Sequence, residues 1–152
     1  MSRFLVDTNV FVYAYDAGEK DKQAIAERLL RELQPTGLAA ISAQVLGEFF
    51  RVVTTRLSPP MPVREAARLI GFIAESFATW GIDDLVVLEA ARGVRDHRLS
   101  YWDSQLWATS RLRGARFILT EDFADGRTLE GVTFRDPFRS GFDIGRLIAA
   151  AT

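Results

Sequence analysis

The chain has 152 residues, of which 48% are hydrophobic, including 11 Phe and 3 Trp. This length favours one domain, and the apolar content is sufficient for a buried core, which excludes an intrinsically disordered chain. Lys and Arg number 19 against 20 Asp and Glu, for a net charge of −1. The chain therefore lacks the overall basic excess that marks many nucleic-acid-binding proteins.

Cysteine is absent and His97 is the only histidine. This composition excludes disulfides, thiolate metal sites and multi-histidine sites, so any bound metal would need oxygen ligands, which suits Mg²⁺ or Mn²⁺. No stretch approaches the roughly 18 apolar residues of a membrane span, and the N-terminus leads directly into an apolar strand without a signal peptide. We therefore expect a cytoplasmic protein without a membrane partner.

The first predicted strand ends at an acidic residue. Phe4, Leu5 and Val6 form a short apolar run typical of a buried strand, and Asp7 follows it directly, before a helical run over 10–15. At the carboxyl end of a strand in an open α/β sheet, Asp7 would lie where ligands bind. The alternative is that Asp7 only caps the helix that follows.

Helices and strands alternate along the rest of the chain. Apolar spacing predicts helices over residues 19–33, 42–55, 63–77, 85–96 and 99–113, and strands over 38–41, 80–82, 117–119 and 132–134. Ser42 is the expected N-cap of its helix. The alternation implies a parallel sheet of about five strands with helices on both faces and the first strand in the centre.

Two acids lie near the starts of predicted helices. Glu48 borders the apolar stripe of its helix, and a buried carboxylate costs several kcal/mol unless it is paired or holds a metal. A salt bridge to Arg51 or a boundary position would also explain it. Asp103 lies three residues after Ser100, the spacing of a capping box, but it also shares a helical row with apolar residues, which favours an inward orientation.

The apolar run over residues 117–119 is, like the first run, followed by acids, here Glu121 and Asp122. Because the carboxyl ends of parallel strands share one edge, topology predicts Asp7, Asp122 and, more weakly, Glu48 at that edge, and leaves Asp103 unplaced. Clustered carboxylates raise one another's pKa unless a divalent cation relieves the repulsion, and such centres hydrolyse phosphodiesters. No Ser/His/Asp set, P-loop or dinucleotide-binding loop points to another chemistry.

Four short motifs resemble those of PIN-domain ribonucleases, most of all the VapC toxins of bacterial and archaeal type II toxin–antitoxin pairs. They are Asp7-Thr8-Asn9, Leu46-Gly47-Glu48-Phe49, Tyr101-Trp102-Asp103-Ser104 and Leu119-Thr120-Glu121-Asp122. The resemblance extends over residues 3–138, with Asp136 where one branch of the family has Asn. It implies a PIN-like three-layer α/β/α domain over 1–138, with 139–152 as its C-terminal tail or a short packing helix.

The resemblance also implies roles for individual residues. The catalytic acids are Asp7, Glu48, Asp103 and Asp122. Three of them, Asp7, Asp103 and Asp122, would bind Mg²⁺ or Mn²⁺ directly or through water, while Glu48 assists. Asn9 and Thr120 would support the site by hydrogen bonds. Glu121 is an alternative to Asp122 as the fourth catalytic acid, but the Thr-x-Asp pattern of the family favours Asp122.

The implied function is a divalent-metal-dependent endoribonuclease, the toxin of a toxin–antitoxin pair, with RNA as substrate, a cognate antitoxin as partner and a homodimeric state. The alternatives are a PIN-type nuclease of RNA processing or DNA repair without an antitoxin, a non-catalytic PIN-fold binding module and, more distantly, a phosphatase. A phosphatase of the haloacid-dehalogenase type would want Asp where the chain has Asn9. Phe49, Phe50, Phe72 and Phe77 predict a groove for an amphipathic antitoxin helix.

Overall fold

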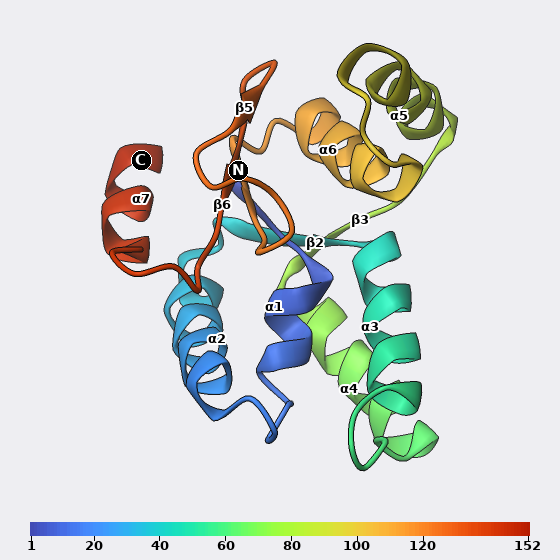
Figure 1. Ribbon diagram of the computed structural model, residues 1–152, viewed down its shortest axis with the longest axis vertical. Helices are drawn as coiled ribbons and strands as arrows, with labels where there is room; N and C mark the ends of the chain where they lie inside the picture. The colour runs from blue at the N-terminus through green and yellow to red at the C-terminus, as the bar shows by residue number, and fades with distance from the viewer.

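The computed structural model describes all 152 residues and contains one six-stranded sheet (Figure 1). Its strands are β1 (Phe4–Val6), β2 (Ala39–Ser42), β3 (Ala78–Trp80), β4 (Phe117–Leu119), β5 (Thr128–Leu129) and β6 (Val132–Arg135). They lie in the order β3-β2-β1-β4-β6-β5, and every neighbouring pair is parallel except β5 with β6. The predicted α/β fold with a parallel sheet and an interior first strand is confirmed.

Helices cover both faces of the sheet. They are α1 (Thr8–Tyr13), α2 (Lys20–Leu33), α3 (Ala43–Thr55), α4 (Val63–Ser76), α5 (Asp84–His97), α6 (Tyr101–Arg113) and α7 (Ile144–Ala151), with a short 3-10 helix η1 (Gln34–Thr36) after α2. Figure 1 shows α1 to α4 on one side of the sheet and α5 and α6 on the other. None of the helices combines the length and the hydrophobicity that crossing a membrane requires.

The register of the central strands fixes where the site lies. All three residues of β1 are fully buried, because β2 and β4 flank the strand and helices cover both of its faces. Val6 pairs with Leu119 of β4, and the N–H of Asp7 continues the ladder by donating to the carbonyl of Leu119 at 3.0 Å. The residues that follow β1 and β4, Asp7 and Thr120, therefore emerge side by side at one edge.

The five predicted parallel strands are present, and the sheet differs from the prediction in two local details. The sheet has a sixth strand, β5, which forms a hairpin with β6 through a two-residue turn in which both Glu130 (φ 46°) and Gly131 (φ 85°) are left-handed. Such turns match the twist of a hairpin, but a two-residue strand leaves no periodic signal. β3 also begins two residues earlier than expected, because Gly81 and Ile82 connect it to Asp83, the N-cap of α5.

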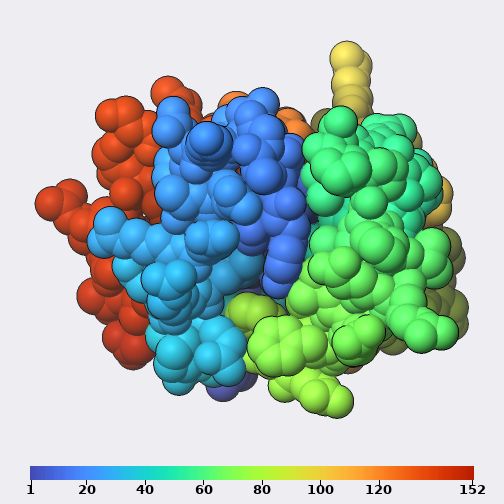
Figure 2. Space-filling model, turned by 90° about the horizontal axis from the view of Figure 1, so that it is seen from below, coloured from blue at the N-terminus to red at the C-terminus, as the bar shows by residue number.

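Most of the phenylalanines expected to line a groove belong to the core. Phe49 is fully buried, and it and Phe77 pack edge-on against Phe11, with ring centroids 6.4 and 5.6 Å away. Phe50 is partly buried against the same core, and only Phe72 is largely exposed, at 64%. In Figure 2, which views the molecule from below, α1 lies between α2 and the α3–α4 pair.

The chain ends in a helix that packs on the rest of the fold. In α7, Ile144, Leu147 and Ala151 are buried, and the side chain of Asp143 caps the helix by accepting from the N–H of Arg146 at 3.2 Å. Residues of α7 and α2 line a shared surface cavity, which places the two helices side by side. The last segment is thus continuous with the core of the preceding residues.

Candidate active site

Asp7 lies at the carboxyl end of β1 and is only 8% exposed. Its Oδ1 accepts a hydrogen bond from the N–H of Thr8 at 2.7 Å, which makes it the N-cap of α1. Its Oδ2 accepts from the hydroxyl of Thr120 at 2.7 Å and from Nδ2 of Asn9 at 3.4 Å. The two interpretations of Asp7 are therefore compatible, since one carboxylate oxygen caps the helix while the other faces the neighbouring strand end.

The charge of Asp7 is poorly compensated. Its pKa is raised from 3.8 to about 7, chiefly by burial, with a smaller rise from Asp122 and Glu48, whereas the hydrogen bonds from Thr120 and Thr8 oppose the rise. No basic side chain lies in ion-pair range of this carboxylate. A buried carboxylate without a cation is unstable in its charged form, so this position favours either a proton or a bound cation.

Asn9 joins Asp7 to Asp122. Its Nδ2 donates to Oδ2 of Asp122 and to the hydroxyl oxygen of Thr120, both at 3.2 Å, in addition to Asp7. The same hydroxyl oxygen accepts from the N–H of Asp122 at 3.1 Å. Partial burial raises the pKa of Asp122, and nearby Glu121 adds to the rise, while the bond from Asn9 opposes it. The amide oxygen of Asn9 is buried and has no hydrogen-bond partner.

Glu48, on α3, connects to the same edge through Thr8. The hydroxyl of Thr8 donates to Oε2 of Glu48 at 2.8 Å, and Nε2 of Gln44 donates to Oε1 at 3.1 Å. The considered salt bridge between Glu48 and Arg51 is not formed. Both oxygens of this carboxylate are thus held by neutral donors rather than by a positive charge.

Asp103 lies in the first turn of α6, where topology alone did not place it. Its N–H donates to the hydroxyl of Ser100 at 3.2 Å, but its carboxylate makes no hydrogen bond back, so only half of the expected capping box is present. Asp103 is close enough to Asp122 to raise the pKa of that residue. Gln44 ties this turn to α3 by donating to the carbonyl of Trp102 at 3.1 Å.

The two acids after β4 have different surroundings. Glu121 accepts from Nζ of Lys22 at 2.8 Å and from the hydroxyl of Tyr13 at 2.5 Å, so its charge is compensated. Lys22 also lies over the rings of Tyr13 and Phe138, at 4.7 and 5.7 Å from their centroids. Asp122, in contrast, accepts a hydrogen bond from Asn9, which also contacts Asp7. The geometry therefore favours Asp122 over Glu121 as the fourth acid of the site.

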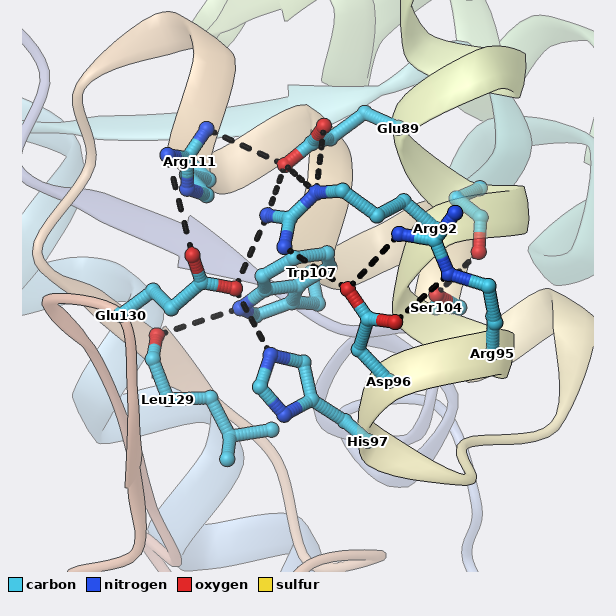
Figure 3. Close-up of polar contacts among 11 residues, drawn as sticks. Glu89, Arg92, Arg95, Asp96, His97, Ser104, Trp107, Arg111, Leu129 and Glu130 are labelled. Atoms are coloured by element: carbon cyan, nitrogen blue, oxygen red, sulfur yellow. Dashed lines mark hydrogen bonds and ion pairs between the residues drawn. The ribbon is translucent and has the colours of Figure 1, made fainter.

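A second group of acids, on α5 and the β5–β6 turn, forms a salt-bridge network (Figure 3). It comprises Glu89, Asp96 and Glu130 together with Arg92, Arg95, Arg111 and His97. The guanidinium of Arg92 lies beside all three acids and 5.3 Å from the ring centroid of Trp107. Hydrogen bonds from the arginines lower the pKa of Glu89 and Asp96, and hydrogen bonds with His97 and Arg92 lower the pKa of Glu130. This network ties α5, α6 and the hairpin together, and it leaves no acid without a partner.

The four acids at the sheet edge fit a cation by the chemistry of their donors. No three His, Asp or Glu side chains converge tightly enough to surround an ion in the positions they occupy here. However, the donors are all oxygen atoms, the pKa values of Asp7 and Asp122 are raised, and the buried Oδ1 of Asn9 lacks a partner. Carboxylate and amide oxygens are the ligands that Mg²⁺ and Mn²⁺ prefer.

Sequence reasoning missed the polar residues that connect these acids. Thr8 lies within the first motif but received no role, and Gln44 was not considered. Helical spacing would have found Gln44, because it lies four residues before Glu48 on the same face of α3. The ion pair of Lys22 with Glu121 joins residues far apart in the sequence, so no local pattern predicts it.

Comparison with known proteins identifies the fold. The chain is similar to VapC20 of Mycobacterium tuberculosis, described as a sarcin–ricin loop cleaving toxin (19% identity, TM-score 0.64, 78% of this chain and 89% of that one). It is also similar to a toxin–antitoxin complex from Klebsiella pneumoniae (17%, 0.63, 88% and 96%) and to DNA-bound VapBC from Salmonella typhimurium (15%, 0.63, 90% and 99%). No curated protein matches the sequence. The family model of the PIN domain matches residues 4–124, and the chain belongs to the PIN domain family.

Proposed function

We propose that this protein is a divalent-metal-dependent endoribonuclease and the toxin of a toxin–antitoxin pair. The observation that carries the proposal is the pair of strand-end acids Asp7 and Asp122, joined by Asn9, with raised pKa values and no cation beside them. Family membership supports a nuclease. The likeness to a toxin that cleaves the sarcin–ricin loop and to VapBC complexes supports RNA as the substrate and an antitoxin as the partner.

In this proposal Asp7, Asp103 and Asp122 hold Mg²⁺ or Mn²⁺. When bound, such an ion lowers the pKa of a water molecule and stabilises the charge that develops on the phosphodiester. The hydroxyl of Thr120 and the amide of Asn9 keep Asp7 and Asp122 oriented. Because the pKa of Asp7 is about 7, metal binding near neutral pH displaces a proton from this residue.

Glu48 has a supporting role in the proposal. Its two oxygens already accept hydrogen bonds from Thr8 and Gln44, which fixes the carboxylate at the margin of the site. As the family resemblance implies an assisting role for Glu48, we assign it to a water-mediated contact with the ion rather than to a direct one. We also assign residues 139–152 to the same domain as 1–138, since α7 packs on it, and we expect a homodimer.

The test uses the purified protein and a labelled RNA. We expect cleavage with Mg²⁺ or Mn²⁺, complete loss in EDTA and recovery when the metal is restored. Asp7→Asn should abolish cleavage, whereas the matched control Asp16→Asn should not, because Asp16 only accepts from the N–H of Gly18 in the loop after α1. Undiminished cleavage in excess EDTA would refute the metal-dependent mechanism.

The toxin role needs a separate test in cells. Expression of this gene alone should arrest growth, and co-expression with the adjacent reading frame should relieve the arrest and yield a complex that co-purifies. A nuclease of RNA processing or DNA repair would need no such neighbour. Exposed Phe72 on α4 provides a surface probe, since a charge placed there by Phe72→Glu would weaken an antitoxin that docks on this face and would leave RNA cleavage intact.

A further inference from the structure

A chain of side-chain hydrogen bonds connects α6 to Glu48. The hydroxyl of Tyr101 donates to Oε1 of Gln105 at 2.9 Å, and Nε2 of Gln105 donates to Oε1 of Gln44 at 2.9 Å. Nε2 of Gln44 then donates both to Oε1 of Glu48 and to the carbonyl of Trp102, each at 3.1 Å. The chain thus starts in the first turn of α6, crosses to α3 and ends on a carboxylate of the candidate site.

The direction of this chain follows from its ends. An ionised carboxylate only accepts hydrogen bonds, so Gln44 must turn its NH₂ group toward Glu48 and its oxygen toward Gln105. Gln105 then donates through its own NH₂ group and presents its oxygen to the hydroxyl of Tyr101. Each amide is oriented by the one before it, which leaves a single consistent arrangement.

Gln105 has no reason of its own to be polar. It is 6% exposed and lies in the buried part of α6. A buried amide destabilises a fold unless its groups are hydrogen-bonded, so its presence indicates a use for the bonds that it makes. Its oxygen accepts from Tyr101, and its NH₂ group donates to Gln44.

Gln44 makes every hydrogen bond between α3 and α6. The carbonyl that it holds belongs to Trp102, the residue immediately before Asp103. The same nitrogen therefore contacts both the Glu48 carboxylate and the backbone that carries Asp103. Thr8 holds the other oxygen of Glu48, which extends the connection to the helix that Asp7 caps.

We propose that Gln44 and Gln105 are positioning residues that set the separation between Glu48 on α3 and Asp103 on α6, and thereby the affinity of the site for its metal ion. This inference rests on the proposed metal-dependent nuclease function. Gln44 acts through Glu48 and the first turn of α6, and Gln105 acts by fixing the orientation of the Gln44 amide.

The experiment measures Mn²⁺ binding to the RNA-free protein by calorimetry. Gln44→Met and Gln105→Met retain the length of the side chain and remove its donor and acceptor. Each should weaken Mn²⁺ binding about 10- to 100-fold, the range typical of residues that orient metal ligands. The matched control is Gln23→Met on α2, because Gln23 is also partly buried and donates only to the carbonyl of Ala14, and it should bind Mn²⁺ like the wild type.

Two further measurements separate positioning from a loss of folding. Tyr101→Phe removes only the hydroxyl at the start of the chain, and it should weaken Mn²⁺ binding in the same direction even if Gln105→Met does not fold. In the double variant Gln44→Met/Glu48→Gln, the loss of affinity should be smaller than the sum of the two single losses, because part of the effect of Gln44 acts through Glu48. Fully additive losses would overturn the inference.

The wild-type result distinguishes this inference from the proposed function. If wild-type protein binds Mn²⁺ and cleaves RNA while Gln44→Met binds Mn²⁺ equally well, the positioning role is refuted and the nuclease function stands. If wild-type protein neither binds Mn²⁺ nor cleaves RNA, both are refuted.

Discussion

Asp7 and Asp122 share one hydrogen-bond donor, since Nδ2 of Asn9 lies 3.4 Å from Oδ2 of Asp7 and 3.2 Å from Oδ2 of Asp122. A single neutral amide thus stands between two carboxylates whose pKa values are both raised. A bound cation would stabilise this arrangement further. In the metal-free protein, substitution of Asn9 should therefore lower the stability of the fold.

Asn9→Ala should destabilise the metal-free protein by about 1–2 kcal/mol, because hydrogen bonds to charged groups contribute about 1.5–3 kcal/mol and this one is partly exposed. Urea unfolding in EDTA measures the change. Saturating Mg²⁺ should reduce the difference from wild type, since the ion takes over the compensation of charge. Equal stability of the two proteins in EDTA would show that the amide does not relieve repulsion between the acids.

Asp7 should make the metal-free protein less stable as the pH rises. Its pKa is about 7 in the folded state and near 3.8 when unfolded, so the folded state binds the extra proton between these values. The contribution of Asp7 to the free energy of unfolding is therefore most favourable below about pH 4. It falls as the pH rises toward about 7 and then levels off.

The variant Asp7→Asn removes this dependence. An Asn side chain can keep its oxygen toward the N–H of Thr8, and it exchanges the hydrogen bonds from Thr120 and Asn9 for the removal of a buried charge. Thermal melts in EDTA should show the variant more stable than wild type at pH 8, with a smaller difference at pH 5. A variant that melts lower at both pH values would show that Asp7 is mainly a structural cap.

The sequence predicted the strand-end acids because topology alone brings them together. Asp7 and Asp122 follow parallel strands, and parallel strands end at one edge. Asp103 could not be placed in this way, since its helix precedes a strand; hydrogen bonds from Gln44, distant in the sequence, tie its turn to α3. The salt bridges around Arg92 also depend on the packing of α5 against α6, which periodicity does not specify.

Glu48→Gln should reduce RNA cleavage about 10- to 100-fold, whereas Asp103→Asn should abolish it. In the proposed site Glu48 assists through water and is held by Thr8 and Gln44, and residues with such a supporting role typically contribute that range. The carboxylate of Asp103 makes no hydrogen bond or ion pair and is free to bind a metal. Single-turnover cleavage rates at saturating Mg²⁺ compare the two variants, and complete loss in both would make Glu48 a direct ligand.

Lys22 should matter for cleavage more than for stability. Its ion pair with Glu121 is partly exposed, at 37% for the lysine side chain, and pairs of this kind contribute at most about 1 kcal/mol. Without it, however, Glu121 would carry an uncompensated charge next to Asp122 and raise the pKa of that acid further. Because an unpaired carboxylate attracts a divalent cation more strongly than a proton, Lys22→Met should lower the Mg²⁺ concentration needed for half-maximal cleavage, while the melting temperature changes little.

The double variant Lys22→Met/Glu121→Gln tests whether the unpaired charge of Glu121 causes the change in Lys22→Met. Removing the unpaired charge should return the Mg²⁺ requirement close to that of wild type, because the Gln side chain still accepts from the hydroxyl of Tyr13 without repelling Asp122. Glu121→Gln alone should cleave nearly as well as wild type, since Glu121 itself binds no metal in the proposed site. If both variants instead need more Mg²⁺ than wild type, Lys22 acts on the RNA rather than on the acids, and a lower affinity of Lys22→Met for RNA without metal would establish that role.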